Sequence, residues 1–299
     1  MKFSTGLLRA IASSVGISNK KADAGTEKVS AVGPASDSLK TELHRRIEEF
    51  LERDLFFLVV QPVVAFRDDT VTTGEVLSRL NHPERGIIFP DEFLPVVEDL
   101  GLYPKFDRYI FRKSCAWLNR ALTAGERVDC ISVNFSRCTL SEEHLAAELI
   151  AIADRYGVPH GTLAVEITEQ IAENGVACLL DNLNRLKAAG FRIILDDFGS
   201  GVTSFNDLMR YPLDIVKIDR SLLLEAESEK GGMAYRALVS MAKELGTIVV
   251  CEGIETEVQN RFAREAGCHY GQGFLFFQPI AQERVLGRMR KSSILEEDV

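Results

Sequence analysis

Short runs of β-branched and aromatic residues alternate with amphipathic stretches of 10 to 20 residues from Leu39 onward. The runs are typical of strands and the stretches of helices. Eight strands are expected, at Phe56–Gln61, Thr70–Leu77, Cys130–Asn134, Leu163–Thr168, Phe191–Leu195, Ile215–Ile218, Thr247–Cys251 and Tyr270–Phe276. Helices are expected near Thr41–Arg53, Asp91–Glu98, Phe106–Ala124, Glu142–Tyr156, Gly175–Ala189, Thr203–Arg210, Gly232–Leu245 and Glu255–Ala266.

Eight strands that alternate with helices over about 250 residues favour a (β/α)8 barrel of the α/β class. A doubly wound open sheet is the alternative, and the number of strands favours the barrel. The sequence contains no internal repeat and no sign of a second domain, so we expect one folded unit over residues 41–292, followed by a short tail at 293–299.

The charge balance limits the class of partner. The chain has 44 acidic and 35 basic residues, a formal charge of −9 and a pI near 5.2. A chain with this net negative charge is not expected to bind DNA through long-range electrostatic attraction. A bound metal ion can nevertheless make the local potential of a site positive, so that a small anionic ligand can bind there. No stretch approaches the roughly 18 to 20 apolar residues of a membrane-spanning helix. An integral membrane protein is therefore excluded.

The cysteines and histidines do not form a metal-binding pattern. The six cysteines (Cys115, Cys130, Cys138, Cys178, Cys251 and Cys268) contain no C-x-x-C pair. The five histidines contain no i, i+4 pair. We therefore expect buried free thiols in a reducing compartment, which predicts a cytoplasmic protein whose chemistry depends on carboxylates.

Residues 1–40 differ from the rest, because they carry six bases against three acids. Residues 18–38 are rich in Ser, Ala, Gly and Lys, a composition typical of a disordered leader. Ahead of them, apolar residues recur at helical spacing within residues 1–17. That segment fits a short amphipathic helix on a membrane surface or a regulator, with a signal peptide or a leader without function as alternatives.

Polar and charged residues stand where successive predicted strands end. Glu75 and Arg79 lie in the second strand region and Asn134 ends the third. The next strands end on further polar groups: Glu166 and Glu169, Asp196 and Asp197, Lys217 and Asp219, and Glu252 and Glu255. In a barrel these ends meet on one rim, where barrel enzymes carry out their chemistry.

Several carboxylates on one rim repel each other unless a cation lies between them. Oxygen ligands from Glu, Asp and Asn match Mg²⁺ or Mn²⁺. The adjacent aspartates Asp196 and Asp197 are able to flank two ions, an arrangement used for in-line attack on phosphorus. The residues alone therefore predict a two-metal site for a phosphoester.

The chain also resembles the EAL-domain cyclic di-GMP phosphodiesterases over roughly residues 40 to 290. The resemblance rests on eight motifs in order: Gln61-Pro62, Glu75-Val76-Leu77, Asn134, Glu166-Ile167-Thr168-Glu169, Asp196-Asp197-Phe198-Gly199, Lys217-Ile218-Asp219, Glu252-Gly253-Ile254-Glu255 and Gln272-Gly273-Phe274. It implies a modified TIM-like barrel whose first strand is antiparallel to the others. It also implies hydrolysis of cyclic di-GMP to linear pGpG by metal-assisted attack of water, and a homodimer.

The resemblance assigns roles at the matching positions. Glu75, Asn134, Glu166 and Asp196 are implied as ligands of one metal ion, with Asp196 bridging to a second ion that Asp197 helps to hold. Lys217 is implied to orient the attacking water, and Glu252 to act as a base or outer ligand. Mg²⁺ or Mn²⁺ would support turnover, whereas Ca²⁺, which prefers longer and looser coordination, would inhibit it.

The resemblance also implies a substrate groove and an anchored loop. Gln61, Leu77, Arg79 and Gln272 would line the groove, and Glu169 would anchor the loop Asp197–Phe205. Val76, Val202 and Cys251 depart from the usual family residues without removing an expected ligand. The alternative to an enzyme is a receptor that binds cyclic di-GMP without cleaving it and signals to a partner. Such members usually lack ligand residues, which this chain retains.

Overall fold

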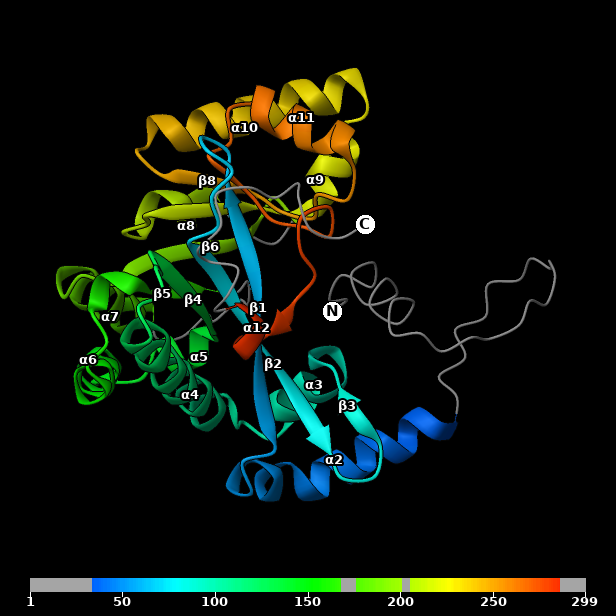
Figure 1. The fold of residues 1–299 in the computed structure, drawn as a ribbon, viewed down its shortest axis with the longest axis vertical. Coiled ribbons are helices and arrows are strands. Elements are labelled where there is room, and N and C mark those ends of the chain that lie inside the picture. Colours follow the sequence, from blue (N-terminus) through cyan, green and yellow to red (C-terminus); the bar gives the residue numbers. More distant parts are fainter. Residues whose placement is uncertain (1–33, 168–175, 201–204, 286–299) are drawn as a thin grey trace.

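The computed structural model of this 299-residue chain describes residues 34–167, 176–200 and 205–285. Within these residues eight strands close into a barrel with helices packed around it (Figure 1). The barrel strands are β1 (Phe56–Ala65), β2 (Thr73–His82), β4 (Cys130–Phe135), β5 (Leu163–Ile167), β6 (Arg192–Phe198), β7 (Ile215–Ile218), β8 (Ile248–Cys251) and β9 (Tyr270–Gly271). The predicted barrel is confirmed, and the open sheet is excluded.

The first strand has the orientation that the family resemblance implies. β1 is antiparallel to both of its neighbours, β2 and β9, whereas every other neighbouring pair in the closed barrel is parallel. Two short strands extend this region, with β3 (Gly86–Ile88) paired to β2 and β10 (Ile280–Ala281) paired to β1. As a result β1 begins at the rim where the parallel strands end.

Helices follow most strands and cover the outside of the barrel (Figure 1). They are α2 (Pro34–Glu52), α3 (Pro90–Asp99), α4 (Tyr103–Thr123), α5 (Arg137–Leu140), α6 (Leu145–Tyr156), the 3₁₀ turn η1 (His160–Thr162), α7 (Val176–Ala188), α8 (Phe205–Arg210), α9 (Arg220–Glu225), α10 (Glu229–Glu244), α11 (Glu257–Glu265) and α12 (Gln282–Val285). Every predicted helix is present. The short α5, α9 and α12 were not predicted, because four to six residues carry too little periodicity.

Several boundaries differ from the sequence expectation. β1 and β2 continue past the predicted ends at Gln61 and Leu77, to Ala65 and His82, and two further differences have a local cause. α2 begins at Pro34, so helix extends into the segment assigned to the leader. Proline suits this position because its fixed φ is helical and its missing N–H is not needed in the first turn. β9 ends at Gly271, whereas a strand was expected through Phe276. The chain turns there because Gly273 lies against the backbone of Ile254, where a Cβ atom would be 2.1 Å from the Ile254 oxygen.

The barrel interior is apolar at one level and polar at the next. Five small or branched residues, one from each of β4 to β8, belong to one buried cluster: Cys130, Ala164, Ile194, Ile215 and Val250. Because strand side chains alternate, the residue two positions further along each strand also points inward. Those residues are Ser132, Glu166, Asp196, Lys217 and Glu252. The alternation thus places charged groups above an apolar floor.

The cysteines agree with the expectation only in part. All six are free thiols, and Cys115, Cys130, Cys251 and Cys268 are buried. Cys138 is exposed, contrary to the prediction, because it lies in the solvent-facing turn of the short helix α5. Among the described helices, none combines the length and the apolar character required to span a membrane.

Candidate functional site

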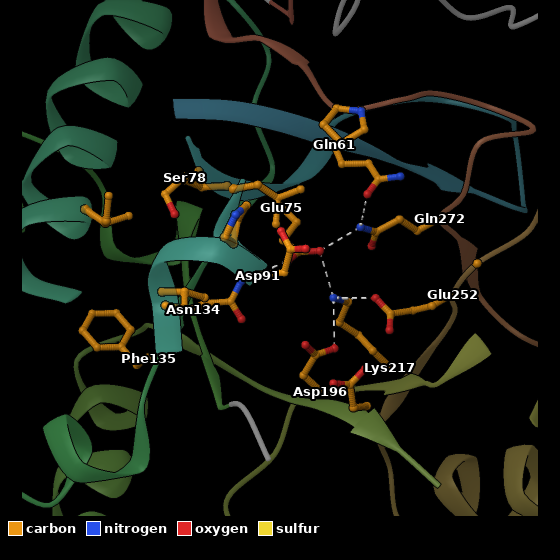
Figure 2. A pocket seen from close by; sticks show the side chains of 18 of the residues that line it. Gln61, Glu75, Ser78, Asp91, Asn134, Phe135, Asp196, Lys217, Glu252 and Gln272 are labelled. Atoms are coloured by element: carbon orange, nitrogen blue, oxygen red, sulfur yellow. Dashed lines mark hydrogen bonds and ion pairs between the residues drawn. The ribbon is translucent and has the colours of Figure 1, made fainter. Parts of the chain in front are cut away.

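Lys217 lies at the centre of the polar layer and pairs with carboxylates from four strands. Its Nζ atom is 2.5 Å from Glu166, 2.6 Å from Glu252, and 3.1 Å from both Glu75 and Asp196. Figure 2 shows the Glu75, Asp196 and Glu252 side chains converging on this ammonium group. The strand ends therefore meet at one point, as the sequence predicted.

The surrounding charges set the ionisation of this cluster. Burial favours the neutral form of Lys217, but the negative charges of Asp196, Glu166 and Glu252 outweigh it and hold its pKa well above the usual value. Burial, together with the nearby Glu75 charge, raises the pKa of Glu166 well above its usual range. Burial also raises the pKa of Glu252 in the same direction, despite the attraction of Lys217. The single positive charge of Lys217 is thus too small to balance the negative charges of the surrounding carboxylates.

A β-bulge in β6 brings two adjacent aspartates to the same side. Leu195 pairs with Val216 and Phe198 with Ile218, so β6 uses one residue more than β7 over this interval. Successive strand residues normally point to opposite faces, and a bulge re-aims one of them. Asp197 accordingly has a φ of 51°, a conformation that non-glycine residues rarely adopt. The charge of Asp196 and burial raise the pKa of Asp197 to about 8.

The acidic cluster has the donor chemistry of a divalent-cation site. Asp196, Asp197 and Glu252 each offer an oxygen atom, and these atoms lie within 4.8 Å of one another. The buried Glu166 Oε2 has no hydrogen-bond partner among the described residues, although buried polar atoms are normally paired. Five carboxylates and one ammonium leave a formal charge of −4, which two divalent cations would balance. The residues fit such ions.

Amide side chains connect the first strand and the last strand to this cluster. Gln272 Nε2 donates to Glu75 at 2.8 Å and to Gln61 at 3.2 Å. Asn134 Nδ2 donates to the other Glu75 oxygen at 2.9 Å, which leaves the Asn134 carbonyl oxygen as its ligand atom. Gln61 is paired with Glu75 across the β1–β2 ladder. The structure thus brings these predicted residues together in one site.

Arg79 lies further along β2, where it is 6% exposed. Its guanidinium carbon lies 5.0 Å from the centroid of the Phe89 ring, and Nη1 donates to the Ser78 carbonyl. Burial lowers the Arg79 pKa to about 10, partly offset by the charges of Glu75 and Asp91. Arg79 therefore stays charged at neutral pH.

A cavity of about 350 Å³ opens over the carboxylates. Its polar part is lined by Glu75, Asn134, Asp196, Asp197, Lys217, Glu252 and Gln272, and Gln61, Leu77 and Arg79 also line the cavity. A second part is lined by apolar residues of α3 and α4, including Leu94 and Phe106. This size suits a drug-sized or nucleotide-sized ligand. Figure 2 shows Asp91 and Phe135 on the side of the cavity that faces these helices.

Sequence reasoning missed several lining residues, and one prediction cannot be placed. Asp91 lies in the first turn of α3, and Arg220 begins α9. Neither residue belongs to a strand-end motif to which the sequence assigned a role. The proline just before Asp91 indicates where the helix begins, but it gives no sign that Asp91 lines the cavity. Glu169 falls outside the described residues, so its anchoring role stays a prediction.

The fold and the site define a class of protein. It is an α/β barrel with an antiparallel first strand, whose carboxyl rim carries an acidic site suited to divalent cations beneath a ligand-sized cavity. The model of the EAL domain matches residues 44–279. This chain therefore belongs to the EAL domain family.

Individual relatives support this assignment. The chain is 31% identical over 240 residues to the cyclic di-GMP phosphodiesterase NbdA of Pseudomonas aeruginosa, covering 80% of this chain and 31% of NbdA. It is 28% identical over 272 residues to the cyclic di-GMP phosphodiesterase RocR of the same organism, covering 87% of this chain and 69% of RocR. A solved structure of the phosphodiesterase PaMucR in complex with c-di-GMP has a TM-score of 0.75 and 31% identity, covering 82% of this chain and 99% of that chain.

Proposed function

We propose that this protein is a divalent-cation-dependent phosphodiesterase that hydrolyses cyclic di-GMP to linear pGpG. The observation that carries the proposal is the cluster of Asp196, Asp197 and Glu252 beside Lys217, at the base of a cavity of about 350 Å³. The relatives named as cyclic di-GMP phosphodiesterases support the substrate and the reaction. The chain spans only 31% of NbdA, so regulation through other domains is not carried over.

We assign the metal-binding role to Glu75, Asn134, Glu166, Asp196 and Asp197. When bound, Mg²⁺ or Mn²⁺ would lower the pKa of a water molecule and neutralise the charge of the phosphate. Asp196 is the carboxylate best placed to serve two ions, because it neighbours both Lys217 and the Asp197–Glu252 group. The bulge in β6 supports this role because it delivers two carboxylates from one strand.

The remaining residues position water and substrate. Lys217 Nζ donates a hydrogen bond to the attacking water and orients it toward the phosphorus atom. Glu252 accepts the proton of that water or serves as an outer ligand, roles supported by its place beside Asp196, Asp197 and Lys217. Arg79 donates to the phosphate as a planar fork. Gln61, Leu77 and Gln272 line the groove that holds the dinucleotide.

Product analysis tests the proposal against the receptor alternative. Purified protein is incubated with cyclic di-GMP in Mg²⁺, Mn²⁺ or Ca²⁺, and the nucleotides are separated by chromatography. We expect pGpG in Mg²⁺ or Mn²⁺, and binding without cleavage in Ca²⁺, because Ca²⁺ prefers longer and looser coordination. Binding of the dinucleotide with no pGpG in any metal would establish the receptor instead. A homodimer and a membrane or regulator contact through residues 1–17 stay predictions.

A further inference from the structure

Arg137, on the short helix α5, is a buried arginine that no strand-end motif contains. It is 9% exposed, and its Nη2 atom donates to Asp207 of α8 at 2.9 Å. Nη1 donates to the Tyr211 hydroxyl at 3.2 Å, and the guanidinium carbon lies 5.6 Å from the centroid of the Tyr211 ring. Asp207 is itself only 14% exposed in its side chain. This contact between two short helices is thus largely shielded from water.

The contact joins two parts of the rim that are not neighbours in the sheet. Arg137 lies three residues after Asn134, at the end of β4, whereas Asp207 belongs to α8, the next described helix after β6, and Tyr211 follows that helix. β5 lies between β4 and β6, so no ladder hydrogen bond ties these two strand ends to each other. The side-chain link supplies that connection.

The α5 end of the link is held firmly. The buried Asp107 carboxylate of α4 accepts hydrogen bonds from the Ser136 amide at 3.0 Å, from the Ser136 hydroxyl at 2.8 Å and from the Thr139 hydroxyl at 2.6 Å. Ser136 is also the N-cap of α5 and accepts from the Thr139 amide. A helix of four residues does not hold its place by its own hydrogen bonds. The hydrogen bonds to Asp107 therefore hold α5, and with it the backbone of Arg137, in one position.

The strand that precedes α8 in the chain is strained where it reaches the rim. Asp197 has a positive φ, and such a conformation persists only where the surrounding structure over-determines it. A buried ion pair adds little stability compared with apolar packing of the same volume, and its best supported use is to select one arrangement among several. The Arg137–Asp207 pair therefore fits a positional role better than a stabilising one.

We propose that Arg137 is a positioning residue for the cation site. Through Asp207 and Tyr211 it fixes α8, the next described helix after β6, relative to β4, so that Asp197 and Asn134 stay at the spacing that the ions require. This inference rests on the proposed function, because it assumes that the carboxylates bind divalent cations.

Metal affinity measured without substrate tests the inference. Mn²⁺ is titrated into the parent protein, Arg137→Met, Asp207→Asn and the double variant, and free Mn²⁺ is followed by electron paramagnetic resonance. Loss of a residue that orients ligands typically weakens metal binding about 10- to 100-fold. We expect that loss in each single variant, and no further loss in the double variant, because the two residues act as one unit.

Arg108→Met is the matched control. Arg108 of α4 also forms two ion pairs, at 2.6 Å to Glu142 and at 2.7 Å to Glu148 of α6, and its side chain is 16% exposed. It touches no strand end of the site, so Mn²⁺ affinity should equal that of the parent. Arg137→Lys, which keeps the charge, should recover part of the affinity. These comparisons separate positioning from a general loss of stability, which metal-free melting curves record in parallel.

The outcomes are distinct. Parent-like Mn²⁺ affinity in Arg137→Met and Asp207→Asn would overturn the positioning role alone. An equal loss in Arg108→Met would also overturn it, since any lost ion pair would then have the same effect. A parent protein that binds no Mn²⁺ would refute the proposed function, and the inference with it. If Arg137→Met does not fold, Asp207→Asn and Arg137→Lys decide the question.

Discussion

At the scale of single residues, Lys217 is the counter-charge of the site. The sequence placed it at the end of a predicted strand, and the family resemblance implied that it orients the attacking water. The structure adds that it forms ion pairs with four carboxylates from different strands. These contacts connect distant parts of the chain, and no local pattern encodes the distances between them.

Replacing Asp196 with asparagine tests the central ligand. Asp196→Asn removes a charge that contributes to the cation site and contacts Lys217, so turnover of cyclic di-GMP should fall by at least about 10³-fold. Binding of the nucleotide should suffer less, because Arg79, Gln61 and the groove remain. Rates of pGpG formation and binding isotherms check both effects. Asp181→Asn, on an exposed position of α7, is the control and should leave both unchanged. A modest loss of rate would contradict the assigned role.

The Asp197 carboxyl group is expected to lower the stability of the metal-free protein while it contributes to metal binding. Its carboxylate is buried beside Asp196 in a backbone conformation that asparagine tolerates as well as aspartate does. Asp197→Asn should therefore raise the metal-free stability by roughly 1 kcal/mol, while it weakens Mn²⁺ binding. Urea unfolding in the presence of a chelator measures the first effect. Asp181→Asn again serves as the control. If Asp197→Asn lowered the metal-free stability, the buried Asp197 carboxyl group would not be a source of instability in the metal-free protein.

At the scale of elements, periodicity made most strands and helices predictable. Cys130–Asn134 and Ile215–Ile218 were found because short runs rich in β-branched residues are typical of buried strands. The bulge that re-aims Asp197 could not be found, because it depends on how β6 pairs with β7. Asp91 and Phe106 were not predicted as lining residues for a related reason. They lie on α3 and α4, and whether a helix residue lines the cavity depends on how that helix packs against the barrel.

The junction of α4 and α5 gives a pH prediction. Burial raises the pKa of Asp107 to about 6, despite the hydrogen bonds from Ser136 and Thr139. Between the unfolded pKa of 3.8 and about 6, the folded protein binds more protons than the unfolded chain. The free energy of unfolding attributable to Asp107 should therefore fall as the pH rises through this window, by at most about 3 kcal/mol, and then level off.

Asp107→Asn should remove this pH dependence, because asparagine does not titrate. Urea unfolding at pH 4.5, 6 and 7.5 should give a difference in stability between parent and variant that shifts in favour of the variant as the pH rises. Asp129→Asn, at an exposed position, controls for the loss of one acid elsewhere. A difference that stays constant across the three pH values would show that Asp107 does not carry the effect.

At the scale of the whole molecule, the antiparallel first strand decides where the N-terminal helix lies. Because β1 begins at the catalytic rim, α2 is brought to the same end as α3, which lines the cavity (Figure 1). Lys40 pairs with Asp99 of α3 at 3.1 Å, and Glu42 pairs with the buried His82 at the end of β2. The sequence predicted the helix, but only the strand direction implied by the family resemblance places it there.

Two N-terminal deletions test where the folded unit starts. Residues 1–33 are basic and of low complexity, so deleting them should leave the melting temperature and the rate of turnover unchanged. Deletion through Glu52 also removes α2, whose Leu43, Ile47, Phe50 and Leu51 are at most 5% exposed. Each such side chain contributes roughly 1.5 to 3 kcal/mol on burial, so this second deletion should abolish cooperative unfolding or lower stability by about 5 kcal/mol or more. Calorimetry of both variants beside the full chain measures the difference. A parent-like melt after the second deletion would show that α2 is an appendage, and a loss after the first would show that residues 1–33 pack against the barrel.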